Sequence, residues 1–306
     1  MPKRIVVTGA TGLIGRGLCA ALIGRGDQVV VFSRNPGAAR DKVAGAAEYV
    51  AWDAAEDGAW ASALDGADAV VNLGASSLFE QRWTDAFKRE IRDSRVIGTR
   101  GIVGAIGRAT RKPAVLVNAS AVGIYGNRVH ERLDESSSLG HDFLANVCRE
   151  WEAEATKAAP LGTRVVLLRT GIVLDPGEGA LKQLMLPFQF GIGGPVLPGT
   201  QWISWIHRAD EVDLILQSLD DPGISGPLNA TAPNPQTNAQ FSRVLGVAMG
   251  RPSWIPVPGF AVRAVIGGAS ETVTNGQYVL PAKALAHGYR FRFENSEAAL
   301  RDLLRG

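Results

Sequence analysis

The chain has little cysteine: only Cys19 and Cys148 occur among its 306 residues. Two cysteines are too few for a disulfide framework, so the hydrophobic core must hold the fold, as in proteins of a reducing compartment. Long apolar runs are also lacking, because no stretch approaches the roughly 18 residues that a membrane span needs. The apolar stretch near the N-terminus stops at Thr8, too soon for a signal peptide. We therefore expect a cytoplasmic protein without a membrane segment.

An excess of charge of one sign is missing as well. The chain has 32 Lys and Arg against 30 Asp and Glu, which gives a formal net charge of +2. This balance argues against a nucleic-acid binder, which normally carries a basic face. The hydrophobic content of 46% excludes a disordered chain, and the 36 glycines follow no G-X-Y period, which excludes collagen. What remains is a globular protein with one large domain or two fused lobes.

Short apolar runs separated by helical patterns organise residues 1–170. The runs are continuous rather than alternating, which indicates strands buried on both faces, as in a parallel sheet covered by helices. They lie at 5–7, 29–32, 69–72, 115–117 and 165–168, with a weaker run at 49–52. Helical patterns cover 12–24, 82–108 and 142–156. This alternation predicts an α/β protein with a Rossmann-type, doubly wound parallel sheet.

The pattern becomes irregular after Arg169. Residues 175–200 contain four prolines and six glycines, and Pro-marked loops recur from Gly223 onward. Helices are expected over 209–219, 240–249 and 296–304. We predict a Rossmann domain over 1–170, to which 203–220 returns, and a smaller C-terminal substrate lobe over 171–306. The two lobes should leave a cleft at the carboxyl ends of the strands.

A glycine-rich turn directly follows the first strand. Gly9, Gly12 and Gly15 have G-x-x-G-x-x-G spacing, between the strand and an amphipathic helix. In this context the glycines permit a tight turn, a close approach of the backbone to a pyrophosphate, and close packing of helix on strand. The N-terminus of the helix adds unpaired N–H groups for an anion. The turn predicts a dinucleotide-binding site; a purely structural turn is the alternative.

The end of the second strand indicates which dinucleotide binds. An Asp or Glu at this point would hold the ribose hydroxyls of NAD, but no acid occurs between Gln28 and Arg40. The chain has Ser33 and Arg34 instead, and an arginine can bind a 2′-phosphate through charge-assisted hydrogen bonds. We therefore predict NADP as the cofactor, with a solvated surface arginine as the alternative.

Several segments together resemble the extended short-chain dehydrogenase/reductase superfamily. The resemblance is carried by TGATGLIG at 8–15, SRNP at 33–36, VNLGA at 71–75 and SAVGIYG at 120–126. Further segments resemble the atypical "epimerase family protein" branch, which is nucleoside-diphosphate-sugar epimerase-like. These are CREWE at 148–152, LPF at 186–188, WIH at 205–207, NATAP at 229–233 and VLP at 279–281. The resemblance covers almost the whole chain, and a homodimer is a habit of the superfamily.

The resemblance also implies a set of cofactor-binding residues. They are Gly9, Thr11, Gly12, Leu13, Ile14, Ser33, Arg34, Asp53, Leu73, Gly74, Ala75, Glu90, Arg95 and Arg169. The last three are implied by their position in the branch. For Glu90, a solvated helix face is the alternative. Arg169 ends a buried strand, where an unpaired charge would be costly, so we expect it to point into the cleft.

The proton relay that is usual in short-chain reductases is missing. These enzymes carry Tyr-x-x-x-Lys, but the residues four positions after the four tyrosines are Asp53, Val129, Ala282 and Phe293. Ser120, at the end of the fifth strand, could orient a substrate carbonyl or merely end the strand. Tyr125 could donate a proton as an acid of ordinary pKa, or be a packed loop tyrosine.

Three functions follow from these observations. The first is an NADP-dependent oxidoreductase or epimerase-like enzyme for a small-molecule substrate, with Ser120 and Tyr125 as candidate catalytic residues. The second is a regulator that binds NADP(H) without turnover, which the missing Tyr-x-x-x-Lys favours. The third is a scaffold that binds a partner. We expect neither nucleic acid nor membrane as a partner, and no metal ligand set is recognisable around His130, His141, His207 or His287.

Overall fold

The computed structural model describes residues 2–53 and 58–305. Its seven main strands are β1 (Arg4–Thr8), β2 (Gln28–Ser33), β3 (Glu48–Ala51), β4 (Ala69–Asn72), β5 (Val115–Ala121), β7 (Arg164–Thr170) and β11 (Gly226–Ala230). They form one parallel sheet in the order β11-β7-β5-β4-β1-β2-β3. The predicted Rossmann-type sheet is confirmed.

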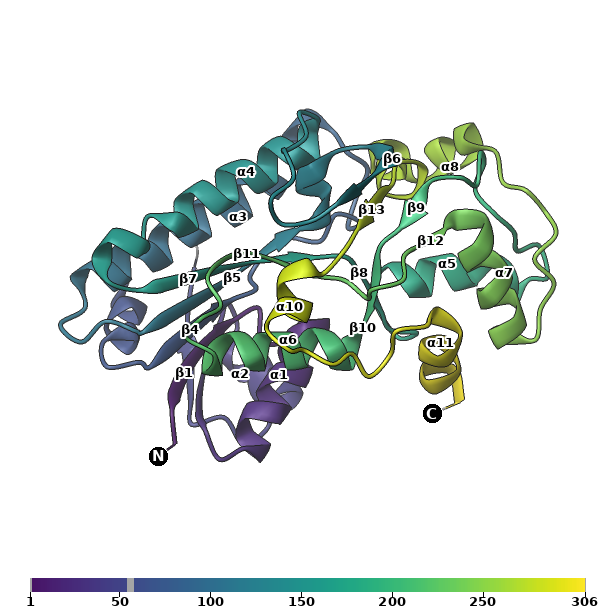
Figure 1. The fold of residues 1–306 in the computed structure, drawn as a ribbon. Coiled ribbons are helices and arrows are strands. Elements are labelled where there is room, and N and C mark those ends of the chain that lie inside the picture. Colours follow the sequence, from purple (N-terminus) through teal and green to yellow (C-terminus); the bar gives the residue numbers. More distant parts are fainter. Residues whose placement is uncertain (1, 54–57, 306) are drawn as a thin grey trace.

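Helices cover both faces of this sheet (Figure 1). On one face lie α1 (Leu13–Gly24), α2 (Pro36–Lys42), α6 (Arg208–Asp220) and α10 (Ala282–Ala286), which share a core with one set of strand side chains. On the other face lie η1 (Ala59–Leu64), α3 (Asp85–Arg108) and α4 (Phe143–Thr156). Alternate residues of each strand feed the two cores, because successive side chains point to opposite faces. The continuous apolar runs are therefore explained by burial on both sides.

Two segments beyond residue 200 contribute to the sheet domain. Helix α6 packs against α1 and shares its core, whereas Ile203 and Trp205, in the same segment 203–220 that was predicted to return, pack in the core of the smaller lobe. Strand β11 pairs in parallel with β7, from Gly226 opposite Val166 to Ala230 opposite Thr170. This strand falls within residues 171–306, the predicted smaller lobe, because its Gly-Pro start conceals the strand pattern in the sequence.

The remaining chain builds a smaller lobe, drawn at the right of Figure 1. Its own core combines Leu181 and Phe188 with Trp205, Phe241 and Leu300. Its helices are α5 (Gly179–Gln189), α7 (Asn238–Met249), α8 (Gly259–Ile266), α9 (Glu271–Thr274) and α11 (Ser296–Arg305). Its short strands are β8 (Ile172–Leu174), β9 (Trp202–Ile203), β10 (Trp205–His207) and β12 (Gln236–Thr237); β13 (Gln277–Val279) pairs with β6 (Arg128–Leu133).

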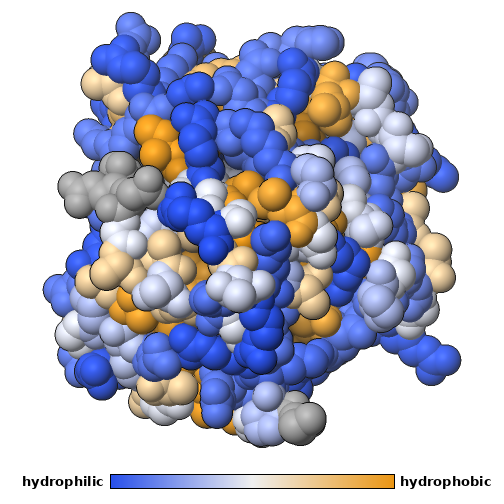
Figure 2. All heavy atoms as spheres, turned by 90° about the vertical axis from the view of Figure 1, so that its left-hand side faces the viewer, coloured by the Kyte–Doolittle hydropathy of each residue, from blue (hydrophilic) through white to orange (hydrophobic). Residues whose placement is uncertain are grey.

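Hydrophilic side chains dominate the face of the molecule seen in Figure 2, with apolar residues in separate groups between them. Both cysteines, Cys19 and Cys148, are free and buried. Across residues 2–53 and 58–305, no helix is long and apolar enough to cross a membrane.

Candidate functional site: a dinucleotide crevice

The crevice of the sheet opens between β1 and β4, where the strand order reverses. Hydrogen bonds tie the two strand ends together. The Thr8 hydroxyl donates to Asn72 Oδ1 at 2.6 Å and accepts from the Gly74 N–H at 3.0 Å. Asn72 in turn donates to Asn118 Oδ1 on β5 at 2.7 Å. This buried network sets the positions of the loops that follow β1 and β4.

The glycine turn after β1 is shaped by contacts that exclude side chains. Gly9 has φ +64°, and a Cβ there would lie 2.7 Å from the backbone of Leu73. A Cβ on Gly15 would lie 2.2 Å from the Gly9 carbonyl oxygen, so the helix packs directly on the turn. Gly12 precedes α1 and provides no side-chain cap, which leaves the first N–H groups of the helix available to an anion. Leu13 and Ile14 form the first turn of α1, and their binding to a cofactor stays a prediction.

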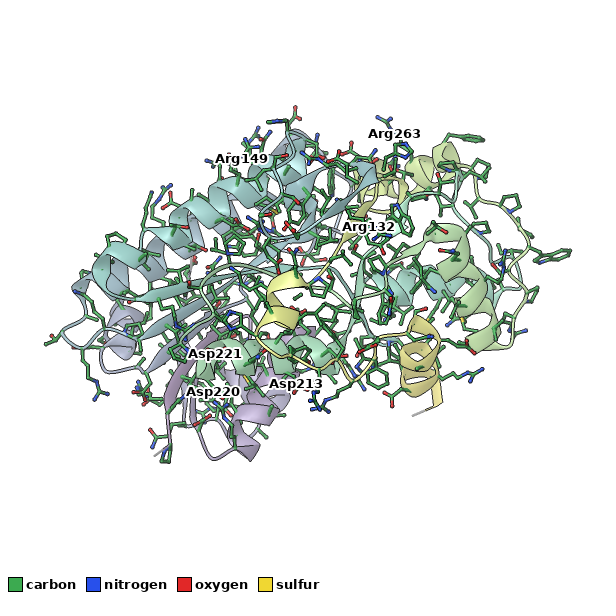
Figure 3. All side chains as sticks on the ribbon, viewed as in Figure 1. Arg132, Arg149, Asp213, Asp220, Asp221 and Arg263 are labelled. Atoms are coloured by element: carbon green, nitrogen blue, oxygen red, sulfur yellow. The ribbon has the colours of Figure 1, made fainter. Side chains whose placement is uncertain are left out.

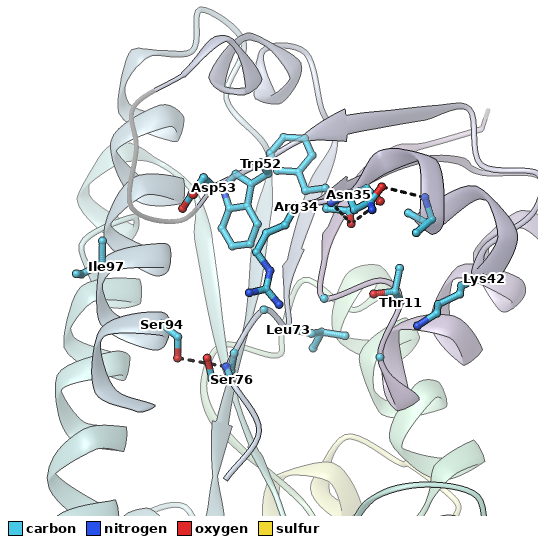
Figure 4. A pocket seen from close by; sticks show the side chains of 18 of the residues that line it. Thr11, Arg34, Asn35, Lys42, Trp52, Asp53, Leu73, Ser76, Ser94 and Ile97 are labelled. Carbon is cyan, nitrogen blue, oxygen red and sulfur yellow. Dashed lines mark hydrogen bonds between the residues drawn. The ribbon is translucent and has the colours of Figure 1, made fainter. Parts of the chain in front are cut away.

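A cavity of about 620 Å³ lies beside this turn (Figure 4). Its volume is in the range of cofactor pockets. Ten predicted cofactor residues line it: Gly9, Thr11, Gly12, Ser33, Arg34, Asp53, Leu73, Gly74, Ala75 and Glu90. Further lining residues that the sequence analysis did not assign to the site include Asn35, Lys42, Trp52, Ser76, Ser94 and Ile97.

Two cations line the cavity at the end of β2. Figure 4 shows the Arg34 side chain extending into the cavity with Trp52 beside it. Lys42 lines the cavity from the last turn of α2, a helix whose N-terminus is capped by Asn35. Lys42 was not predicted from the sequence, although the helix start signalled by Asn35 and Pro36 could have placed it on a helix directly after the end of β2. Each of these cations is suited to bind a phosphate group of a ligand in the cavity.

Trp52, which lines the same cavity, has a buried indole N–H group that is left without a partner among the described residues. Its Nε1 is buried and has no hydrogen-bond partner within residues 2–53 and 58–305. Burying such a group without a partner is unfavourable by about 1–3 kcal/mol, so a ligand acceptor would satisfy it. This unused donor and the cradle left by Gly9 both fit a bound dinucleotide.

Helix α3 holds the loop after β4 through one serine. Ser76 accepts a bond from Arg95 at its carbonyl (3.2 Å), donates from its hydroxyl to Glu90 (3.3 Å) and from its N–H to Ser94 (3.2 Å). Arg95 also bonds the Ile91 carbonyl and stacks over Trp151. Arg95 is thus a half-buried support of the loop, whereas Glu90 reaches the cavity wall.

Arg169 and Glu152 form a buried ion pair behind the crevice. Arg169 Nε and Nη2 donate to the two Glu152 oxygens at 2.9 and 2.8 Å. From the sequence we expect Arg169 to point into the cleft, because burying its charge without a partner would be unfavourable. In the structure the Arg169 charge is buried but paired, because Glu152 on α4, 17 residues earlier in the chain, provides the opposite charge.

Ser120 and Tyr125 belong to the same network. The Ser120 hydroxyl donates to Glu152 at 2.7 Å, and the Tyr125 hydroxyl donates to Asn229 at 2.7 Å while accepting from Arg169 at 3.0 Å. Both side chains are buried, and burial raises the pKa of Tyr125. These contacts favour the alternatives that the sequence left open, a serine at a strand end and a packed tyrosine. Ala121, which follows Ser120 on β5, lines a second cavity, whereas Ser120 and Tyr125 are not among the residues of its lining.

A second cavity of about 170 Å³ lies where β5 and β7 end, against the smaller lobe. Its walls are mainly apolar, with Ala121, Val122, Leu144, Ile172, Leu184 and Trp202 among them. Polar groups on its lining include Thr170 and Ser204. Since carboxyl ends of parallel strands face the crevice, this cavity is placed for the reacting end of a ligand.

With this site described, comparison with known families identifies the class of protein. Residues 5–227 match the family described as "NAD dependent epimerase/dehydratase family", and residues 257–303 match a domain of unknown function, DUF1731. The chain belongs to the NAD dependent epimerase/dehydratase family, which confirms the resemblance seen in the sequence.

Individual relatives are similar along the whole chain. The "Epimerase family protein SDR39U1 homolog, chloroplastic" of Arabidopsis thaliana is 40% identical, over 98% of this chain and 86% of that protein. The "Epimerase family protein YfhF" of Bacillus subtilis is 38% identical, over 98% and 97%. The crystal structure of human epimerase family protein SDR39U1 with NADPH has a TM-score of 0.88 and 34% identity, and covers 99% of both chains.

Proposed function

We propose that this protein is an NADP-dependent oxidoreductase or epimerase-like enzyme that acts on a small molecule. The observation that carries the proposal is the Arg34 side chain, which enters the large cavity at the end of a strand that lacks the acid typical of NAD binding. The human relative solved with NADPH supports the same cofactor. The cytoplasmic location and the homodimer remain predictions.

Different residues of the large cavity would hold different parts of the cofactor. Ser33, Arg34 and Lys42 would hold the 2′-phosphate, and the N-terminus of α1 with Gly9 and Gly12 would hold the pyrophosphate. Trp52 Nε1 would donate to the adenosine half. Bound NADPH supplies the hydride of the reaction. The apolar second cavity would hold the substrate and exclude water from the reacting atoms.

One observation favours the second function, a regulator that binds NADP(H) without turnover. Tyr125 is buried within a network to Arg169 and Asn229, so it is not free to exchange protons with a substrate. Ser120 is equally engaged with Glu152. We propose that these residues support the crevice, and that an enzyme of this chain must obtain its proton from another group.

Calorimetric titration with NADPH and NADH tests the cofactor assignment. We expect NADPH to bind at least about tenfold more tightly than NADH, because hydrogen bonds to a charged group contribute about 1.5–3 kcal/mol. Arg34→Ala should remove this preference and leave NADH binding unchanged. Arg40→Ala is the matched control, since Arg40 lies on α2 and stacks over Tyr49. Equal affinities for both dinucleotides in the wild type would contradict the assignment.

A further inference from the structure

Glu211 and Asp210 are both buried in the first turn of α6, but among the described residues only Asp210 has several hydrogen-bond donors, from Tyr289, Arg292 and Phe293. Two further acids of α6, Asp213 and Asp220 (labelled in Figure 3), are partly exposed, and they pair with Arg292 and with Lys3 and Arg25 respectively. Glu211 lies in the first turn of the same helix, yet its exposed fraction is 0%. A buried carboxyl without a cation is costly as an anion, so its position requires an explanation.

The carboxyl of Glu211 contacts a residue of the second cavity. The Thr170 hydroxyl donates to Glu211 Oε1 at 2.7 Å, and its other acceptor, the Leu168 carbonyl oxygen, is more distant at 3.5 Å. Thr170 is the last residue of β7 and lines the small cavity. Because side chains alternate along the strand, Arg169 faces α4 and Thr170 faces α6. Thr170 thus connects the buried acid to the cavity.

The second oxygen of this carboxyl is unused. Glu211 Oε2 is buried and has no hydrogen-bond partner within the described part of the chain. Burial raises the pKa of Glu211 to about 8, so the group is largely protonated at neutral pH. A neutral acid has a proton to give, and it needs no counter-charge.

Within residues 2–53 and 58–305, no charged side chain has a hydrogen bond or ion pair with the Glu211 carboxyl. The elements around α6 carry several charged or titratable side chains, and β5 and β8 carry none. They are Arg16 and Cys19 on α1, Arg25 directly after α1, Arg164 and Arg169 on β7, His207 on β10, and His287, Tyr289, Arg290 and Arg292 after α10. On α6 itself they are Arg208, Asp210, Asp213 and Asp220. Among the described residues, none of these has a hydrogen bond or ion pair with Glu211.

We infer that Thr170 and Glu211 form a proton-donating pair for the carbonyl oxygen of a substrate held in the second cavity. The inference rests on the proposed function. When Glu211 carries its proton on Oε1, the direction of this hydrogen bond reverses: the carboxyl O–H donates to Thr170 Oγ1, and the Thr170 hydrogen is free to point into the cavity. Thr170 is the catalytic residue in this scheme, and Glu211 is a positioning residue that replenishes its proton.

The step balances in atoms and charge. The hydride from NADPH forms the new C–H bond at the carbonyl carbon, and the carbonyl π bond breaks toward oxygen. Thr170 gives its proton to that oxygen and takes the proton of Glu211, so the product is an alcohol. Glu211 becomes a carboxylate as the cofactor becomes cationic, and solvent returns the proton after release. The pair thereby supplies what the missing Tyr-x-x-x-Lys would supply.

The coupling between Glu211 and the nicotinamide charge can be measured without knowing the substrate. NADP⁺ should displace the Glu211 proton because its ring is cationic, whereas NADPH should not. Calorimetry at pH 7 in two buffers of different ionisation enthalpy gives the protons released by each dinucleotide. The difference between the two cancels the titration of the shared 2′-phosphate. We expect NADP⁺ to release close to one proton more than NADPH in the wild type.

Variants separate this pair from other acids at the site. Glu211→Gln should abolish the difference in released protons and leave NADPH affinity unchanged within about twofold. Glu271→Gln, an exposed glutamate on the lining of the same cavity, is the matched control and should behave as the wild type. A wild-type difference near zero, or a difference that survives Glu211→Gln, overturns the inference. Absence of binding by both dinucleotides would instead overturn the proposed function.

Infrared spectroscopy gives a second measurement that needs no Glu211 variant. The wild-type NADPH complex should show a protonated carboxyl C=O band that is lost in the NADP⁺ complex. Thr170→Val should shift this band, because it removes the hydrogen bond to Glu211. A band that is absent from both complexes, or unchanged between them, overturns the inference.

Discussion

Arg169 and Glu152 meet in a two-pronged ion pair of 2.9 and 2.8 Å, with exposed fractions of only 3% and 7%. The pair joins the end of β7 to α4, and Ser120 and Tyr125 both bond to it. Residues that the sequence suggested for catalysis and for cofactor binding are thus held in one buried network. Through these contacts the network supports the ends of β5 and β7 that border the crevice.

The first prediction concerns this ion pair. Glu152→Ala should lower the free energy of unfolding by about 3–5 kcal/mol, because it leaves the Arg169 charge buried and unpaired. Replacement of both partners, in Glu152→Leu with Arg169→Met, should recover much of that loss. The measurement is urea unfolding at pH 7.

The control for the ion pair is Arg100→Ala, which breaks a pair between Glu154 and a largely exposed arginine. This change should lower the free energy of unfolding by no more than about 1 kcal/mol. Equal losses for Glu152→Ala and Arg100→Ala would show that the buried pair has no special role in stability.

The second prediction concerns the glycine turn. Gly9→Ala combines a strained φ of +64° with a Cβ only 2.7 Å from the Leu73 backbone. We expect it to weaken NADPH binding by at least about tenfold, since strain of about 1–3 kcal/mol must be relieved by moving the turn. Calorimetric titration measures the effect.

Gly24→Ala is the matched control for the glycine turn, because it lies at the end of α1 and its Cβ would meet nothing within 4 Å. It should leave NADPH affinity unchanged and raise the free energy of unfolding by up to about 1 kcal/mol. Normal NADPH affinity in Gly9→Ala would exclude the turn as part of the binding site.

The third prediction concerns pH and stability. The pKa of Glu211 is raised by burial from 4.5 to about 8, so the folded state binds this proton more tightly than the unfolded chain does. Its stabilising contribution is full below about pH 4.5 and is lost as the pH rises to about 8, by about 1.4 kcal/mol per pH unit at most. The wild type should therefore lose stability relative to Glu211→Gln across this interval.

Urea unfolding of both proteins from pH 5 to pH 8.5 measures this difference. The comparison with Glu211→Gln removes the contributions of all other titrating groups, provided that they are distant from residue 211. A difference in unfolding free energy that does not change with pH would mean that Glu211 titrates normally in the folded protein.

Much of the fold could be predicted from local patterns. Continuous Val-rich runs predicted the buried parallel strands, because only side chains covered on both faces permit such runs. Gly9, Gly12 and Gly15 predicted the turn, and Arg34 without a nearby acid predicted the charge at the end of β2. Each of these signals is contained in a segment of a few residues, so it can be interpreted without knowing the rest of the fold.

Only the tertiary structure decided the partners of the buried charges. Arg169 and Glu152 are 17 residues apart, and Thr170 and Glu211 are 41 apart, with no spacing rule to connect them. Glu211 follows Asp210 at a helix start, a pattern typical of a solvated first turn. Its burial depends on how α6 packs against the sheet, which long-range contacts determine. The sequence by itself determined the strands and the glycine turn, whereas packing decided which polar groups face the crevice and which support it.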